Sequence, residues 1–159
     1  ADITLETSKK GKVRWQAKKA TFKNIPTRQH DRKKERFIRV DRPYLKHLGI
    51  TSSQGKVLKN AQAKYKQLDK YIEIMSSLLE SIPIEQPLNI VDMGSGKGYL
   101  TFALYDYLTH QQQRPVKVVG IELRQHLVDL CNEVAQEMGF DYLTFIAQDI
   151  NDYPAESID

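Results

Sequence analysis

Three carboxylates in this sequence, those of Asp92, Glu122 and Asp149, each stand at or just after the end of a short apolar run. Apolar runs of this length are typical of buried strands. The carboxyl ends of parallel strands meet at one edge of a sheet, and sheets of this kind bind their ligands there. We therefore expect the three carboxylates to face one ligand-binding edge.

A glycine-rich stretch, residues 92–98 (DMGSGKG), follows the first of these runs. A strand, a glycine turn and a helix form half of a nucleotide-binding crossover, whose glycines let a ligand approach the backbone. The phosphate-binding pattern G-x-x-x-x-G-K-[ST] fails, because Gly98 follows Lys97 and the first glycine would fall on Val91. The dinucleotide pattern G-x-G-x-x-G fails at one position, Tyr99.

The acidic side chains suit a ligand that combines adenine, ribose and a zwitterionic tail. Glu122 can accept hydrogen bonds from both ribose hydroxyls, and its charge would repel the 2′-phosphate of NADP. Asp149 can accept a hydrogen bond from the adenine amino group, and Leu123 and Ile150 could sandwich the adenine ring. Asp92 can bind the cationic amino-acid end of such a ligand, directly or through water.

The elements that must position these groups follow from the apolar pattern. An amphipathic helix over residues 56–82, a first strand and two further helix–strand pairs give the order βαβαβ, which predicts an α/β fold with a parallel sheet. Pro83 ends the long helix, and Gly139 caps the last one. The expected strands are 88–93, 116–121 and 143–147, and the expected helices between them are 99–110 and 124–138.

Residues 1–55 form a basic region that ends in the turn 51–55, ahead of the acidic remainder 56–159. Lys and Arg exceed Asp and Glu by ten in residues 1–50, whereas residues 86–159 carry a net charge of −7. This asymmetry predicts an anionic partner, RNA or another nucleic acid, although the arm could also pack on its own acidic domain. The start of the region alternates like a β-hairpin that carries Trp15, on which a base could stack. The candidate phosphate contacts are Arg28, Arg32, Lys33, Lys34 and Arg36.

Several classes of protein are disfavoured by composition. The sequence has no apolar run of about 18 residues and no apolar signal segment, so we expect a cytoplasmic protein that does not span a membrane. A lone Cys131 and four histidines without zinc-type spacing predict no metal site.

The glycine stretch and the downstream acids together resemble the motifs of class I S-adenosylmethionine-dependent methyltransferases. Residues 91–98 resemble motif I, residues 119–122 (VGIE) the acidic second motif, and residues 146–150 (IAQDI) the third. The resemblance implies a Rossmann-like sheet and S-adenosyl-L-methionine as cofactor. The residues that it assigns to cofactor binding are Asp92, Met93, Gly94, Ser95, Gly96, Gly98, Glu122, Leu123, Asp149 and Ile150.

A narrower resemblance covers roughly residues 28–150. Residues 30–34 (HDRKK), 45–50 (LKHLGI) and 64–68 (KYKQL) resemble the lead-in of a subgroup whose members are mostly known only as methyltransferase domains. Such a sheet normally has seven strands, and this sequence supplies the first βαβαβ half, so we expect a truncated chain or half of something larger. We expect a second copy or a C-terminal half to cover the first strand, which would lie at the sheet edge.

Three functions stay open from the sequence. The first is an S-adenosylmethionine-dependent methyltransferase, or its cofactor-binding part, that acts on RNA or another nucleic acid, with no residue assigned as the catalytic base. The second is a non-catalytic nucleic-acid-binding or assembly module that keeps the same fold. The third is an NAD-dependent oxidoreductase, which Tyr99 at the third glycine position disfavours.

Overall fold

The computed structural model describes residues 2–19 and 36–154, which divide into two compact units after Lys34. The second unit includes residues that the sequence had grouped with the basic region. Ile38, Tyr44, Leu45 and Ile50 are buried in the same core as the sheet and its helices. The expected boundary at residue 55 therefore falls inside a packed unit.

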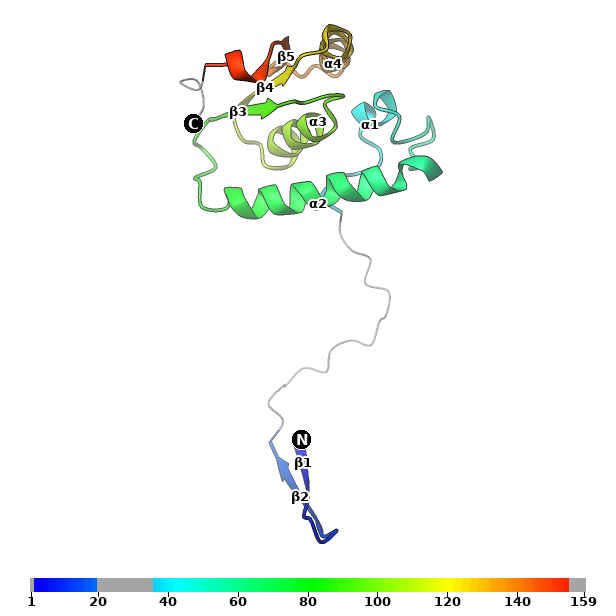
Figure 1. Ribbon diagram of the computed structural model, residues 1–159, viewed down its shortest axis with the longest axis vertical. Coiled ribbons are helices and arrows are strands. Elements are labelled where there is room, and N and C mark those ends of the chain that lie inside the picture. The colour runs from blue at the N-terminus through cyan, green and yellow to red at the C-terminus, as the bar shows by residue number, and fades with distance from the viewer. Residues whose placement is uncertain (1, 20–35, 155–159) are drawn as a thin grey trace. The chain divides into compact units, whose positions relative to one another are not determined.

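The first unit is a two-stranded antiparallel hairpin, as the sequence predicted. Strand β1 (Asp2–Thr7) pairs with β2 (Val13–Lys18), and Gly11 adopts the positive φ that the turn requires (Figure 1). The pairing places Leu5 opposite Trp15, and both side chains are about two-thirds exposed. One face of the hairpin is therefore apolar and open to solvent in the described residues.

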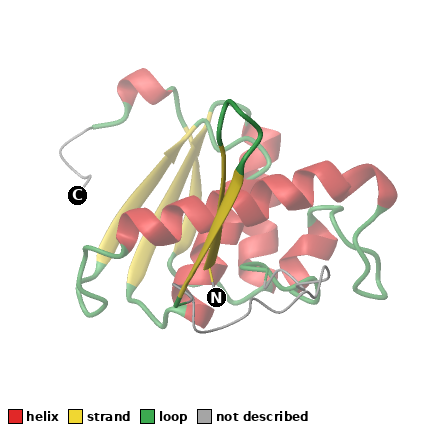
Figure 2. Ribbon diagram, turned by 90° about the horizontal axis from the view of Figure 1, so that it is seen from below, coloured by secondary structure: helices red, strands yellow, loops and turns green. Residues whose placement is uncertain are grey.

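The second unit contains a parallel sheet with the strand order β3-β4-β5 (Figure 2). Strands β3 (Leu88–Met93), β4 (Val116–Glu122) and β5 (Leu143–Ala147) agree with the predicted ones to within a residue. This arrangement confirms the Rossmann-like α/β fold. Among the described residues β3 pairs only with β4, so β3 lies at an edge of this sheet.

Helices connect the strands. Helix α3 (Tyr99–Asp106) continues into a π-helical turn (Tyr107–Gln111), and α4 (Gln125–Glu137) leads to Gly139, which has a positive φ. Val118, Phe102, Phe145 and Cys131 join one core between the sheet and these helices. In Figure 1, α3 lies between the sheet and α2 (Gln62–Leu79).

The long helix is shorter than predicted. Helix α1 (Pro43–His47) precedes a 3-10 turn, η1 (Lys59–Ala61), and α2 begins only after it, whereas the prediction was a helix over 56–82. Val57 forms a β-bridge with Thr51, and the N–H of Leu58 donates to the carbonyl of Ile50. These tertiary hydrogen bonds hold residues 56–58 extended, although their apolar spacing continues the helical pattern.

A buried aspartate fixes the start of the second unit. The Asp69 carboxylate is almost fully buried and accepts the backbone N–H groups of Phe37 and Ile38. The Arg36 guanidinium donates to it at 3.1 Å. Tyr65 Oη also donates to the Ile38 carbonyl. The segment that enters the unit is therefore held by α2.

A buried arginine holds the connection between α2 and β3. Arg114 is 5% exposed and donates to the carbonyls of Ile82, Pro83 and Ile84, which lie between α2 and β3. This guanidinium gives the carbonyls of the connection hydrogen-bond partners that no helix or strand supplies.

No helix in the described residues is long and apolar enough to cross a membrane.

Candidate cofactor site

The glycine turn is attached to the end of the neighbouring strand. The N–H groups of Gly94 and Ser95 donate to the Ile121 carbonyl at 2.8 and 2.9 Å. Gly94, Gly96 and Gly98 have φ values of 78°, 58° and 67°. A side chain is strained in this conformation, so glycine is required there. The turn therefore keeps its backbone close to the end of β4.

Gly98 is also confined by packing. A Cβ at this position would lie 3.0 Å from atoms of Phe102 and Phe145. This close approach lets α3 begin directly on top of the core, immediately after the turn. Gly98 is buried, so its part in the site is to shape the turn.

Glu122 ends β4 and has a complete set of hydrogen bonds. Its Oε1 accepts the backbone N–H of Arg124 at 3.0 Å and Arg124 Nε at 2.8 Å. Its Oε2 accepts the N–H of Gly96 at 2.9 Å and Arg124 Nη2 at 3.2 Å. The Arg124 side chain, then its backbone N–H, lower the pKa of Glu122 to about 2, so the carboxylate is ionised at neutral pH.

Asp149 caps a short 3-10 helix, η3 (Ile150–Asp152). Its Oδ1 accepts the backbone N–H of Asn151 at 2.9 Å and the Asn151 side-chain amide at 2.7 Å. Both of these hydrogen bonds fall on one oxygen, so Oδ2 keeps acceptor capacity for a ligand.

The remaining predicted residues of motif I differ in accessibility. Asp92 is half-buried, and its Oδ2 accepts a 2.5 Å hydrogen bond from Thr101 in α3. Met93 is exposed. The Ser95 hydroxyl is turned inward, 3.0 Å from where a Cβ on Gly120 would lie, and has no hydrogen-bond partner among the described residues. Ser95 therefore contributes its backbone, not its hydroxyl, to the edge.

An open cleft of about 340 Å³ lies beside these groups. It brings together Gly94 from the first strand end, Glu122 and Leu123 from the second, and Asp149 and Ile150 from the third. Leu123 is 69% exposed and Ile150 51%, so two apolar side chains are available to a ring. The residues that line the cleft are Gly94, Glu122, Leu123, Gln148, Asp149, Ile150 and Asn151. The other predicted residues of motif I support this edge without lining the cleft. They are Asp92, Met93, Ser95, Gly96 and Gly98.

Sequence reasoning missed four participants: Arg124, Thr101, Gln148 and Asn151. Asn151 could have been found, because Asp-x-Asn is typical of an Asx turn. Gln148 adjoins Asp149, but glutamine has no pattern that marks a cleft. The contacts of Arg124 with Glu122 and of Thr101 with Asp92 depend on side-chain conformation.

Cys131 lies under the glycine turn, with Sγ 3.8 Å from the Gly96 carbonyl oxygen. Burial, then the charge of Glu122, raise the pKa of this thiol to about 11. The thiol is therefore protonated at neutral pH and is a packing group.

Of the predicted nucleic-acid residues, Arg36 lies in the described part of the chain, and it does not line this cleft. Arg36 donates to buried Asp69, and its guanidinium lies 5.6 Å from the centre of the Tyr65 ring. Its position is explained by these contacts within the second unit. Arg28, Arg32, Lys33 and Lys34 lie outside the described residues.

A family profile described as a methyltransferase domain matches residues 63–158, which are 96 of the 159 residues. The chain belongs to this methyltransferase-domain family. The match includes α2 except its first residue, the sheet and every residue that lines the cleft.

Individual relatives of this methyltransferase domain are distant. The protein-lysine N-methyltransferase EFM4 of Saccharomyces cerevisiae is 29% identical over 82 residues, which are 51% of this chain and 34% of EFM4. The chain thus spans about a third of the length of this curated relative. The bifunctional kinase-methyltransferase WbdD is 21% identical, with a TM-score of 0.46 over 59% of this chain and 20% of its own. Pyrococcus horikoshii TYW2, solved in complex with MeSAdo, is 20% identical, with a TM-score of 0.37 over 49% of this chain and 27% of its own.

The family supports S-adenosyl-L-methionine as the cofactor, and the cleft of this methyltransferase domain fits it. The backbone of Gly94 is open, with nothing within 4 Å of where a Cβ would lie. Asp149 Oδ2 can accept from an adenine amino group, and Leu123 and Ile150 can flank the ring. Glu122 has the chemistry for a ribose, but in this structure its acceptor positions are filled by Arg124 and Gly96.

Proposed function

We propose that this protein is a methyltransferase and that the described second unit is its cofactor-binding part. The single observation that carries the proposal is the cleft at the carboxyl edge of the sheet. It is lined by Glu122 and Asp149 beside a glycine turn, in a chain of a methyltransferase-domain family. The whole protein's activity is inferred, because the chain spans only part of its relative.

When bound, S-adenosylmethionine supplies a methyl group that is attached to a cationic sulfur. The sulfur is a good leaving group, because it becomes a neutral thioether when the methyl group is transferred. The chain's own residues then mainly bind and orient, and correct orientation can lower a reaction barrier substantially. Glu122 and Asp149 would fix the nucleoside by its hydroxyl and amino groups. Asp92, held by Thr101, offers a negative charge to the ammonium of the amino-acid tail.

The acceptor that we propose is RNA or another nucleic acid. The support is the charge distribution, since residues 2–19 carry six Lys or Arg and two acidic residues. Trp15 is 67% exposed on the open face of the hairpin, where a base could stack on it. Stacking beside cations is a common way to hold single strands.

Two rivals have specific observations behind them. A protein acceptor is favoured by EFM4, whose name describes transfer to protein lysine. A non-catalytic module is favoured by the state of Glu122, whose ribose-binding positions are filled by Arg124. Such a module would neither bind the cofactor nor transfer its methyl group.

The test combines cofactor binding with transfer. The protein would be titrated with S-adenosylhomocysteine by calorimetry, then incubated with methyl-labelled cofactor and either RNA or protein extract. We expect binding, label in RNA, and an RNA affinity that falls steeply with salt because counterions are released from phosphates. Trp15→Ala would lower RNA affinity, and Leu5→Ala on the same face is the control.

Each outcome separates the alternatives. Label in protein but not in RNA would favour the protein acceptor. RNA binding without S-adenosylhomocysteine binding would favour the non-catalytic module. Salt-independent or undetectable RNA binding would contradict the nucleic-acid acceptor and leave the cofactor site standing.

We also propose that the free edge of β3 is covered by a second copy of this chain or by further chain. Among the described residues β3 pairs with β4 alone, and an apolar strand at a sheet edge invites pairing with another strand. Sedimentation velocity of the 159-residue chain is expected to show self-association as concentration rises. A stable monomer at micromolar concentrations would contradict this.

A further inference from the structure

The Glu122 carboxylate makes as many hydrogen bonds as it has acceptor positions. A carboxylate has about four lone-pair positions, and four donors reach this one. Two of them are backbone N–H groups, from Gly96 and Arg124, and belong to the fold of the edge. The other two are Nε and Nη2 of the Arg124 side chain.

The two guanidinium donors are arranged like a vicinal diol. Nε reaches Oε1 at 2.8 Å and Nη2 reaches Oε2 at 3.2 Å, so each carboxylate oxygen receives one donor. The two hydroxyls of a ribose would use the same two positions. A ribose and the Arg124 side chain therefore compete for Glu122.

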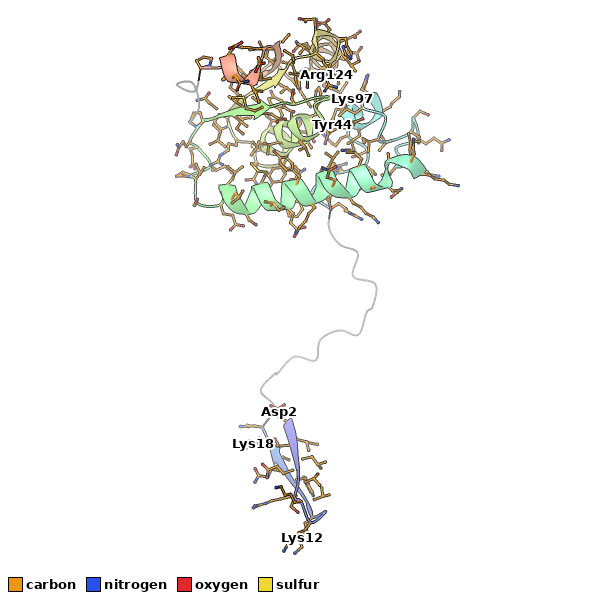
Figure 3. All side chains as sticks on the ribbon, in the orientation of Figure 1. Asp2, Lys12, Lys18, Tyr44, Lys97 and Arg124 are labelled. Atoms are coloured by element: carbon orange, nitrogen blue, oxygen red, sulfur yellow. The ribbon has the colours of Figure 1, made fainter. Side chains whose placement is uncertain are left out.

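The contact is one that a ligand can displace. The Arg124 side chain is 59% exposed, whereas that of Glu122 is 7% exposed. The guanidinium is already partly in solvent, so water can solvate it when it leaves Glu122, which limits the net cost of breaking the pair. Figure 3 shows Arg124 at the same end of the unit as Lys97 of the glycine turn. Glu122 is thus fixed, and Arg124 can turn away into solvent.

Asp149 provides the contrast within the same cleft. Its two side-chain hydrogen bonds, both from Asn151, fall on Oδ1. No cation of the described residues pairs with it in this structure. The cap is therefore specific to the carboxylate that would hold the ribose.

We propose that Arg124 caps Glu122 in the free protein and is displaced when a ligand with two adjacent hydroxyls takes the two acceptor positions. The guanidinium must leave before the hydroxyls bind, so the cap lowers the affinity of every ligand that uses Glu122. A preference for a ribonucleoside over a deoxyribonucleoside comes from Glu122 itself, because a ligand with one hydroxyl fills only one of the two positions. This inference rests on the proposed cofactor site.

The experiment is calorimetric titration of Arg124→Ala, Arg124→Lys and the parent protein with S-adenosylhomocysteine, and with adenosine and 2′-deoxyadenosine as simpler probes. Gln125→Ala is the matched control, because Gln125 is the next residue, bonds to Asp129 and does not touch Glu122. We expect Arg124→Ala to bind S-adenosylhomocysteine about two- to fivefold more tightly at low salt, as a weak exposed ion pair allows. Its preference for adenosine over 2′-deoxyadenosine should remain, because Glu122 is still present, and the affinity of Arg124→Lys should lie between those of the parent and Arg124→Ala.

Salt supplies a readout that a merely structural role would not affect. Raising ionic strength screens the ion pair, so parent affinity should approach that of Arg124→Ala, whose own affinity changes less. Equal or weaker binding by Arg124→Ala, while the parent binds, would overturn the cap and leave the cofactor site intact. Absence of S-adenosylhomocysteine binding in the parent and all variants would overturn the cofactor site and the cap together.

Discussion

Replacing Glu122 with alanine is expected to weaken S-adenosylhomocysteine binding by at least about thirtyfold. Hydrogen bonds to a charged group contribute about 1.5–3 kcal/mol each, and about 2 kcal/mol corresponds to this factor. The substitution also removes the acceptor for the Gly96 N–H, so the glycine turn loses a 2.9 Å contact with β4. Both effects act in the same direction on the cofactor.

Calorimetry on two variants would measure this. Asp129→Ala is a suitable control, because Asp129 is exposed on α4 and accepts a hydrogen bond from Gln125, away from the cleft. It should bind like the parent protein. Equal affinity in Glu122→Ala and Asp129→Ala would show that no ribose contacts this carboxylate.

The same substitution should change how stability depends on pH. The folded-state pKa of Glu122 is lowered to about 2 from an ordinary value of 4.5. A group with a lowered folded pKa stabilises the protein above its unfolded pKa, and this stabilisation is lost as pH falls through the folded value. The difference in Tm between the parent and Glu122→Ala should therefore be largest near pH 7 and shrink from pH 4.5 towards 2.

Gly120→Ala is expected to destabilise the second unit by about 1–3 kcal/mol, the usual cost of overpacking a core. Gly120 lies on the central strand, and its Cβ would come within 2.4 Å of Phe145 Cδ1 and 2.6 Å of Cε1. The Phe145 ring cannot easily retreat, because it packs on Phe102 with ring centroids 5.4 Å apart. The expected fall in Tm is roughly 4–12 °C for a unit of this size.

A double-mutant cycle isolates this contact. Phe145→Leu removes ring atoms and should also destabilise, but Gly120→Ala in that background should cost clearly less than it does alone. Thermal denaturation followed by circular dichroism would measure all four proteins. Additive effects would mean that the cost of Gly120→Ala does not come from Phe145.

The sequence was sufficient to predict the sheet and most of the residues at its carboxyl edge. Apolar runs with clear ends fix the strands, and parallel connectivity then brings Gly94, Glu122 and Asp149 to one cleft. These features depend on local pattern and on one topological rule, so three-dimensional information is not needed to expect them.

Other features depended on backbone contacts that residue spacing does not show, or on side-chain conformation. The start of α2 is displaced by the bridge between Thr51 and Val57, which competes with helical hydrogen bonds. Residues 37 and 38 belong to the second unit because Asp69 of α2 holds their backbone, 31 or more residues away in sequence. Arg124 occupies two acceptor positions of the Glu122 carboxylate, and residue spacing alone does not reveal this side-chain arrangement.

The Arg114 guanidinium has a consequence for local opening of the chain. It donates to the carbonyls of residues 82–84, while Pro115, the next residue, accepts the N–H of Leu88 at the start of β3. The connection from α2 to β3, the start of β3 and the residues just before β4 therefore share one set of hydrogen bonds. They should fray together as a single cooperative segment, because opening any one of them removes partners from the buried Arg114 guanidinium or from the N–H of buried Leu88.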